Sequence, residues 1–299
     1  MRRRRRARWR RTLVAAARVS LGGLILAGCA PEKLLDSASR LAPGDSARQL
    51  ARGAAYGADP RQRLDVWGPK RASGALLPVV IFFYGGAWNS GERGGYGFAG
   101  RAFAAHDFIA VIPDYRLAPQ VRFPSFVEDG AAAVRWVRDH AAAYGGDPAR
   151  ITLSGHSAGS HIAALLALDH HYLRDAGVDP RTIRAAALLS GPYDFLPFTD
   201  ARAVAAMGQW PRLDETQPIH FAAPGAPPML LISGGSDITV RARNSQRLAA
   251  ALSAAGDPVE LKIYPGKDHL DTIKSLSPLF RGSTPALADS VVFLDRYNR

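Results

Sequence analysis

From about residue 61 onward, short apolar runs alternate with longer amphipathic segments. Runs of four to eight apolar residues are typical of buried strands, and apolar positions spaced three and four residues apart are typical of helices. The alternation in Leu64-Asp65-Val66-Trp67 predicts an edge strand. Further strands are predicted at residues 78–83, 108–112, 151–153, 185–189, 229–232 and 259–264. Helices are predicted at residues 127–143, 158–168, 241–255 and 285–297.

This order of elements predicts an α/β protein with one main domain, residues 61–299. Strands separated by helices of this length require parallel crossovers, so we expect a mostly parallel central sheet with helices on both faces. Residues 194–224 interrupt the alternation with several prolines and scattered aromatic residues. We therefore expect this segment to form a small cap over the site. Residues 29–60 show weak periodicity and are interpreted as a tether with a short lead-in helix.

The net charge of +12 comes mostly from the N-terminus. Residues 1–28 hold nine arginines and no acidic residue, which leaves 29 basic residues against 26 acidic ones in the remainder. The body of the protein therefore has a net charge of only +3. A nucleic-acid partner is not expected, because binding one would need a basic surface on the folded domain.

The first 28 residues have the pattern of an export signal, with an arginine cluster followed by a short apolar stretch. Leu26-Ala27-Gly28-Cys29 resembles the lipobox of bacterial lipoproteins. That resemblance implies acylation of Cys29, a lipid anchor in a membrane, and a location facing the periplasm or the cell exterior. Arg10-Arg11-Thr12-Leu13 weakly resembles a twin-arginine signal, so the export route stays open. The alternatives are an uncleaved membrane anchor or a start codon misassigned ahead of a cytoplasmic enzyme.

Cys29 is the only cysteine in the sequence. An intramolecular disulfide, cysteine catalysis and a cysteine-based metal site are therefore excluded. No metal ion is predicted, since His156 and His161 are five residues apart and would not share one helical face. Gly95-Tyr96-Gly97-Phe98-Ala99-Gly100 has dinucleotide-binding spacing, but it does not directly follow a strand. We expect no cofactor.

The strongest functional motif is Gly155-His156-Ser157-Ala158-Gly159, which lies between a predicted strand and a predicted helix. This context is that of a nucleophile elbow, in which a tight turn presents the serine hydroxyl at a helix N-terminus. The flanking glycines remove side chains that would clash in the turn. The alternative is a glycine-rich turn that serves only packing.

A serine nucleophile needs a base and an acid, which follow it in the order acid and then histidine in this type of fold. His269 lies just after the predicted strand 259–264, and Asp237 follows the strand 229–232. Asp194, which follows the preceding strand, is the main alternative to Asp237. Asp268 and Asp271 are further alternatives; Asp268 is adjacent to His269 in sequence, so its side chain would point elsewhere.

The transition state also needs backbone N–H donors for its oxyanion. Tyr84-Gly85-Gly86-Ala87-Trp88 follows the strand 78–83, and its glycines allow amide groups to turn toward the serine. The N–H of Ala158 would add a second donor direction. The alternative is an ordinary glycine turn.

This loop resembles the His-Gly-Gly-x-Trp loop of the hormone-sensitive-lipase and carboxylesterase branch of the α/β-hydrolases. Kynurenine formamidases, prenylcysteine esterases and feruloyl or acetyl-xylan esterases are similar. The resemblance extends to three further runs: Asp114-Tyr115-Arg116-Leu117-Ala118-Pro119, Tyr144-Gly145-Gly146-Asp147-Pro148 and Gly191-Pro192-Tyr193-Asp194.

The resemblance implies an α/β-hydrolase fold and a triad of Ser157, Asp237 and His269. It also implies an oxyanion hole built from three amide groups, those of Gly86, Ala87 and Ala158. Tyr84 stands where the family has a histidine that braces the loop, and we expect Tyr84 and Trp88 to contact the substrate. Trp88, Trp210 and Phe198 are candidates for an apolar pocket, although they fit a core equally well.

The expected function is a serine hydrolase that cleaves carboxylic esters with small or medium acyl groups. An arylformamidase would use the same residues, and a non-catalytic binding lipoprotein would use the same scaffold. A Rossmann-type redox enzyme would require NAD(P) at residues 95–100. The partners expected are a small ester substrate and a membrane, while the oligomeric state stays open.

Overall fold

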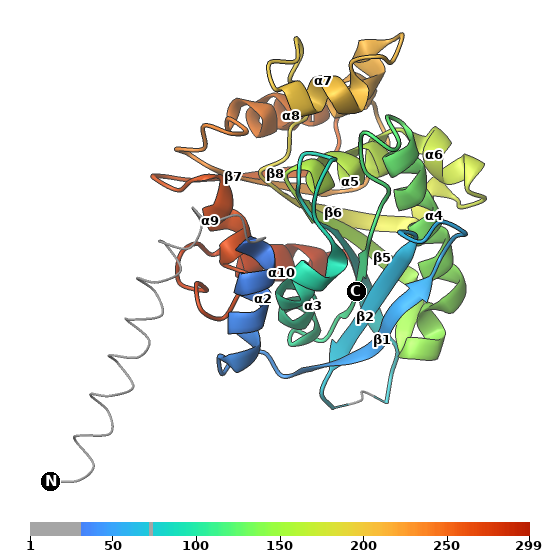
Figure 1. The fold of residues 1–299 in the computed structure, drawn as a ribbon, viewed down its shortest axis with the longest axis vertical. Coiled ribbons are helices and arrows are strands. Elements are labelled where there is room, and N and C mark those ends of the chain that lie inside the picture. Colours follow the sequence, from blue (N-terminus) through green and yellow to red (C-terminus); the bar gives the residue numbers. More distant parts are fainter. Residues whose placement is uncertain (1–30, 72–73) are drawn as a thin grey trace, which may run out of the picture.

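The computed structural model describes residues 31–71 and 74–299, which form an eight-stranded sheet in the order β1-β2-β4-β3-β5-β6-β7-β8 (Figure 1). β2 runs antiparallel to both of its neighbours, and all other neighbouring strands are parallel. The strands are β1 (Ala47–Ala55), β2 (Arg63–Pro69), β3 (Leu77–Phe83), β4 (Ile109–Pro113), β5 (Gly146–His156), β6 (Ile183–Leu189), β7 (Met229–Gly234) and β8 (Val259–Tyr264).

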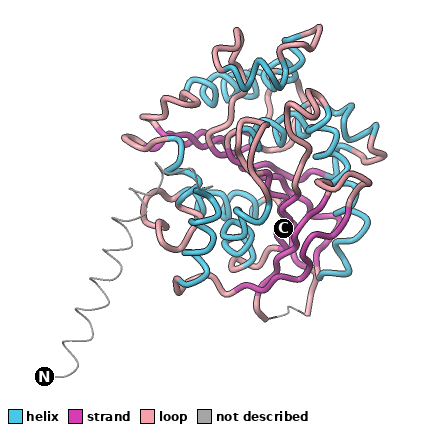
Figure 2. Tube along the Cα trace, viewed as in Figure 1, coloured by secondary structure: helices cyan, strands magenta, loops and turns pink. Residues whose placement is uncertain are grey.

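Helices cover both faces of this sheet, as predicted (Figure 2). One face carries α3 (Gly97–Ala104), α9 (His269–Lys274) and α10 (Ala286–Arg296), with α2 (Pro31–Leu41) packed on α3. The other face carries α4 (Ser125–His140), α5 (Ala158–Leu168), α6 (His170–Asp175) and α8 (Arg243–Ala254). The short 3-10 helices are η1 (Arg93–Tyr96), η2 (Ala141–Tyr144), η3 (Pro180–Thr182), η4 (Leu213–Thr216) and η5 (Pro218–Phe221).

The structure contains the short lead-in helix expected in residues 29–60, α2, but corrects the interpretation of this segment as a tether. Apart from residues 29 and 30, which lie outside the described part, this segment belongs to the folded domain. Asp36 of α2 forms a buried ion pair with Arg101 at 2.9 Å, and Asp45 pairs with Arg281 at 2.8 Å. The apolar pattern did not predict β1, because this edge strand has only one large apolar residue, Leu50. β2, predicted as the edge strand, lies between β1 and β4.

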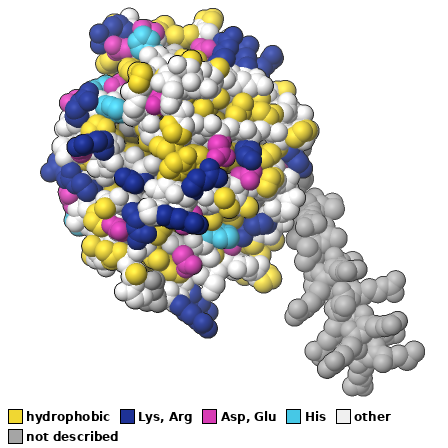
Figure 3. All heavy atoms as spheres, turned by 180° about the vertical axis from the view of Figure 1, so that it is seen from behind, with side chains coloured by type: hydrophobic (Ala, Val, Ile, Leu, Met, Phe, Trp, Pro, Cys, Tyr) yellow, Lys and Arg dark blue, Asp and Glu magenta, His cyan; other side chains and the backbone are white. Residues whose placement is uncertain are grey.

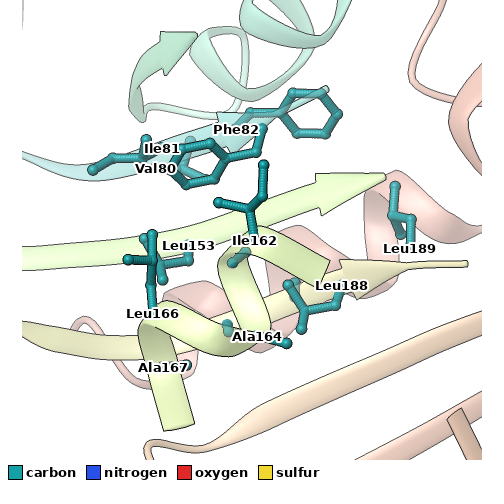
Figure 4. Packing of buried hydrophobic residues seen from close by; sticks show 14 of the residues in the cluster. Val80, Ile81, Phe82, Leu153, Ile162, Ala164, Leu166, Ala167, Leu188 and Leu189 are labelled. Atoms are coloured by element: carbon teal, nitrogen blue, oxygen red, sulfur yellow. The ribbon is translucent and has the colours of Figure 1, made fainter. Parts of the chain in front are cut away.

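The core lies between the sheet and the helix layers, and α5 shows how the sequence builds it. Ile162 and Leu166 are four residues apart, so they lie on the same face of the helix. Both are fully buried, and Figure 4 shows them turned toward the strands that carry Phe82 and Leu153. Burial of each such side chain stabilises the fold by roughly 1.5–3 kcal/mol. This packing holds the start of α5, and with it Ser157, against the end of β5.

The segment 194–224 lies over the α5 side of the sheet and contains α7 (Ala201–Met207), η4 and η5 (Figure 1). It is attached to the domain by Phe123, whose N–H donates to the carbonyl of Ala206 at 2.9 Å. The Phe123 ring also meets Trp210 edge-on, with centroids 5.2 Å apart. Trp210 therefore anchors this cap, and it does not line the pocket described below.

On the face shown in Figure 3, side chains of both charge signs are interspersed with apolar ones. In the part of the chain that the structure describes, no helix is both long and apolar enough to cross a membrane.

Candidate active site

Ser157 is held in a strained turn between β5 and α5. Its backbone angles are φ 55° and ψ −123°, which a residue with a Cβ atom rarely adopts. The turn is tight because a Cβ atom at Gly159 would lie 2.0 Å from the carbonyl oxygen of Phe83. A Cβ atom at Gly155 would lie 2.7 Å from the backbone of Gly159. Both glycines are therefore required by close backbone contact, in agreement with the role predicted for them.

Ser157, His269 and Asp237 form a continuous chain of hydrogen bonds. Ser157 Oγ lies 2.9 Å from His269 Nε2, and His269 Nδ1 lies 2.7 Å from Asp237 Oδ2. The second carboxylate oxygen of Asp237 accepts hydrogen bonds from the N–H groups of Thr239 and Val240. An ionised carboxylate can only accept, so His269 donates from Nδ1 and presents a bare Nε2 to the serine hydroxyl.

Three different strand ends bring these side chains together. Ser157 follows β5, Asp237 follows β7 and His269 follows β8, all at the carboxyl ends of parallel strands. The side chain of Asp237 is fully buried and that of His269 is 12% exposed. This arrangement can deprotonate the serine and stabilise the resulting imidazolium.

The alternative acids are engaged elsewhere. Asp268 and Asp271 form a capping box at the start of α9, in which each carboxylate accepts from the other's backbone N–H. Asp194 pairs with Arg247 at 2.7 Å. The structure thus brings Asp237, and none of these three, into contact with the His269 imidazole.

The loop after β3 presents free amide groups to the same site. Gly86 has φ 138° and Ala87 has φ 48°, and both residues line the same pocket as Ser157. A Cβ atom at Gly86 would lie 2.2 Å from the carbonyl oxygen of Ser90. Within the described chain, the N–H groups of Gly86 and Ala87 donate to no other residue. The N–H of Ala158, in the first turn of α5, has no acceptor within the helix. These are the three donors predicted for an oxyanion hole.

The residues beneath this loop hold it from behind. Tyr115 donates its hydroxyl to the carbonyl of Tyr84 at 2.9 Å, and the N–H of Ala118 donates to the carbonyl of Trp88 at 2.8 Å. Asp114 pairs with Arg93, and its Oδ1 accepts from the hydroxyl of Tyr84 at 2.8 Å. The run 114–119 was recognised in the sequence, but its residues carried no predicted role.

Tyr84 does not contact substrate, which corrects the expectation for this residue. Its side chain is fully buried and is absent from the pocket lining. Its hydroxyl donates to Asp114 and accepts from Arg61 Nη2 at 2.9 Å. Burial raises the pKa of Tyr84 well above its usual value, and the neighbouring Asp114 acts in the same direction. Tyr84 therefore braces the loop as a neutral hydroxyl.

A pocket of about 420 Å³ opens beside Ser157. Trp88 lines it, as predicted, and stacks on Phe195 with ring centroids 5.9 Å apart. Phe198 packs behind Phe195 and is not among the lining residues. The rest of the lining comes from the loop after β3, the elbow, the cap, and the loops that hold Asp237 and His269, together with Tyr96 of η1, Pro192 and Asn244 of α8.

Two buried histidines surround the site without belonging to the hydrogen-bonded chain. His156 donates from Nε2 to the carbonyl of His269 at 3.0 Å, and burial lowers the pKa of His156 well below its usual value. His161 donates from Nε2 to the carbonyl of Thr216 at 2.8 Å, and burial lowers its pKa to about 4. Both are therefore neutral near pH 7. The sequence contained no signal for either contact.

The glycines of the dinucleotide-like run face side chains of this chain. Cβ atoms at Gly95, Gly97 and Gly100 would meet Glu32, Asp36 and Trp67 at 2.6, 2.8 and 2.4 Å. These glycines allow α2 and β2 to pack closely on α3. Across residues 31–71 and 74–299, no cluster of three His, Cys, Asp or Glu side chains is arranged to hold a metal ion.

Comparison with known proteins identifies esterases as relatives. The sequence model of the BD-FAE family matches residues 64–252. The isoprenylcysteine alpha-carbonyl methylesterase ICME of Arabidopsis thaliana is 32% identical over 266 residues, which cover 82% of this chain and 62% of the relative. The esterase LipC of Mycobacterium tuberculosis is 31% identical over 233 residues, 72% of this chain and 58% of the relative. The chain thus spans about three fifths of the length of these relatives.

Solved structures of esterases share the fold. Esterase 2 of Thermogutta terrifontis with bound butyrate is 26% identical, with a TM-score of 0.64 over 85% of this chain and 93% of its own. Esterase B of Lactobacillus rhamnosis, inhibited by a tributyrin phosphonate, is 23% identical, with a TM-score of 0.75 over 93% of this chain and 96% of its own. These similarities confirm the predicted α/β-hydrolase fold.

Proposed function

Because the chain belongs to the BD-FAE family of α/β-hydrolases, we propose that it is a serine hydrolase that cleaves carboxylic esters. The observation that carries this proposal is the chain of hydrogen bonds from Ser157 through His269 to Asp237, at 2.9 and 2.7 Å. It lies beside three amide groups that are free to bind an oxyanion. The esterase names of the relatives support the same reaction class.

In the proposed first half-reaction, Ser157 Oγ attacks the ester carbonyl carbon while His269 Nε2 takes the hydroxyl proton. Asp237 stabilises the imidazolium through the bond to Nδ1. The carbonyl oxygen becomes an oxyanion that accepts from the N–H groups of Gly86, Ala87 and Ala158, and each such donor contributes about 3 kcal/mol of transition-state stabilisation. The carbon–oxygen bond to the alcohol breaks, and His269 returns the proton to the departing oxygen.

In the second half-reaction, water attacks the acyl-enzyme. His269 takes a proton from this water, the same amides bind the second oxyanion, and the proton returns to Ser157 Oγ as the acid leaves. His269 is the histidine whose ring nitrogen contacts the nucleophile, whereas His156 and His161 donate from Nε2 to backbone carbonyls.

The size of the pocket supports the proposal that the acyl group of the substrate is small or medium. Its volume of about 420 Å³ lies at the lower end of the range for small-molecule sites. Aromatic rings from Trp88 and Phe195 form one wall, which favours an apolar group over a charged one.

A panel of p-nitrophenyl esters with acyl chains of two to twelve carbons tests this function. The wild type is expected to hydrolyse short and medium chains, and Ser157→Ala is expected to lose at least a thousandfold in kcat. A fluorophosphonate probe should label wild type and leave Ser157→Ala unlabelled. A wild-type protein that takes up no probe would support a binding protein instead. N-formylkynurenine in the same assay separates a formamidase from an ester hydrolase.

We also propose that the protein is exported and anchored by lipid at Cys29. The support is the run Leu26-Ala27-Gly28-Cys29 after a basic and then apolar stretch; these residues lie outside the described part of the structure. Mass spectrometry of the membrane fraction should find a diacylglyceryl group on Cys29, and Cys29→Ala should abolish it. Recovery of the full leader sequence on the purified protein would contradict the proposal.

A further inference from the structure

The folded domain begins almost immediately after the proposed anchor. α2 starts at Pro31, and its first turn already packs on the domain: a Cβ atom at Gly95 would lie 2.6 Å from the Glu32 side chain. Lys33 pairs with Glu92 at 2.9 Å. Since consecutive Cα atoms are 3.8 Å apart, Cys29 lies within about 8 Å of Pro31. A lipid on Cys29 would therefore be held close to the surface of the domain.

The start of α2 lies beside the pocket. Its neighbour Gly95 belongs to η1, and the next residue, Tyr96, is part of the pocket wall. Farther along α2, Ser39 Oγ lies 2.7 Å from Ser277 Oγ, just after α9. The start of α2 and the pocket are thus on the same side of the molecule.

Exposed apolar side chains occur in the segments that form the pocket: Leu270 lines it, and three others are sequence neighbours of lining residues. Of the eight large hydrophobic residues exposed within the described ranges, four line the pocket or directly adjoin a residue that lines it. We call these four the apolar rim: Leu196, Val204, Ile238 and Leu270. Ile238 follows Asp237 and is 88% exposed, while Leu270 follows His269 and is 44% exposed. Apolar surface exposed beside a site, unlike single apolar side chains scattered over a protein, is typical of a contact surface, and all four residues belong to segments that line one pocket.

We propose that the apolar rim rests on the lipid bilayer that holds the Cys29 anchor, so that the pocket receives its esters from the membrane surface. This inference depends on the proposed lipid anchor, and its substrate consequence depends on the proposed hydrolase activity. The physical reason is that the start of α2, two residues after Cys29, lies on the same side of the domain as the apolar rim. Both can therefore meet the surface of one membrane. Apolar side chains that enter the headgroup boundary leave water, which stabilises this orientation.

A single-cysteine quenching experiment tests the orientation. The full chain, purified with its lipid, is reconstituted in phosphatidylethanolamine and phosphatidylglycerol vesicles. An environment-sensitive dye is attached at Ile238→Cys and, because Ile238 adjoins Asp237, separately at Val204→Cys on α7. The matched control is Leu76→Cys, since Leu76 is 43% exposed and lies just before β3, at the end of the parallel strands opposite to Ser157. Wild type should take up no dye, because its one cysteine is acylated.

We expect lipids with nitroxide-labelled acyl chains to quench the dye at positions 238 and 204 at least threefold more strongly than at position 76. Aqueous iodide should quench in the reverse order. Equal lipid quenching at all three positions would overturn the proposal. Rim positions shielded from iodide but not quenched by lipid would mean that a second copy or another protein covers the rim, which also overturns it.

The same experiment distinguishes failure of the proposed lipid anchor from failure of the proposed hydrolase activity. Wild-type protein that takes up dye at Cys29 and does not float with the vesicles has no anchor, and the inference falls with it. A fluorophosphonate probe in the same vesicles reports on Ser157. Absent labelling would reject the hydrolase while the quenching pattern still decides the orientation.

Discussion

The indole Nε1–H of Trp88 donates to Nδ1 of His161, with the two nitrogen atoms 3.2 Å apart. Nε2–H of the same imidazole donates to the carbonyl of Thr216 in the cap at 2.8 Å. His161 is fully buried, and both ring nitrogens are used. One neutral side chain therefore connects the loop beside Ser157 with the cap segment.

This connection makes stability depend on pH. Burial lowers the pKa of His161 from 6.5 to about 4, so between these values the unfolded chain binds a proton that the folded chain does not. The free energy of unfolding must therefore fall as pH decreases through this window. His161 contributes a loss of roughly 2–3 kcal/mol between pH 7.5 and pH 4.5. His156, whose pKa is also lowered, acts with the same sign.

Urea unfolding of wild type and His161→Gln at these two pH values measures the contribution of His161. Glutamine can keep one or both hydrogen bonds but does not titrate. The variant should lose less stability than wild type on acidification, even if it is less stable at pH 7.5. An equally steep loss in both proteins would contradict the pKa shift.

Asp237 and Asp194 provide a matched pair for the acid. Asp237→Asn removes the carboxylate that orients His269 and should lower kcat by about 10³ to 10⁴, with a smaller change in KM. Asp194→Asn removes only an ion pair with Arg247 at the surface and should change kcat less than threefold. Steady-state kinetics on p-nitrophenyl butyrate measures both. The reverse ranking would exchange the two assignments.

Gly159 is sensitive because backbone, rather than a flexible side chain, faces its missing Cβ. Gly159→Ala would place a methyl group 2.0 Å from the carbonyl oxygen of Phe83, so the elbow or β3 must move. Overpacking of this kind should lower the free energy of unfolding by about 3 kcal/mol and displace Ser157. Gly282→Ala is the control, because no atom lies within 4 Å of its Cβ position. Urea unfolding should give this control a free energy of unfolding close to that of wild type. Fluorophosphonate should label it as fully as wild type.

Tyr84→Phe tests the brace behind the oxyanion loop. The change removes a hydroxyl that bonds both Asp114 and Arg61 in a buried position. We expect a loss of about 1–3 kcal/mol in the free energy of unfolding, because one acceptor oxygen of Asp114 loses a partner. Tyr144→Phe serves as the control: its ring packs on Trp136, and within residues 31–71 and 74–299 its hydroxyl forms no hydrogen bond. A Tyr84→Phe protein as stable as this control would show that the brace has little energetic weight.

Local sequence was sufficient for the elements that meet at the site. The spacing of apolar residues along the chain predicts the buried strands. The glycines on either side of Ser157 identify a tight turn that few other residues permit. Chain order then placed Asp237 and His269 at later strand ends. These features are local, so they are readable without coordinates, and the comparisons agree with the fold they imply.

The tertiary structure decided which distant side chains touch. Asp194 and Asp237 both follow strands, and only the fold pairs the first with Arg247 and the second with His269. Likewise, only the fold shows that Tyr84, expected to contact the substrate, lies behind the loop that follows β3. His161 gained its role from a carbonyl 55 residues away, and β1 gained its place from pairing with β2. Such contacts depend on packing across the sheet, which the period of a single strand or helix does not encode.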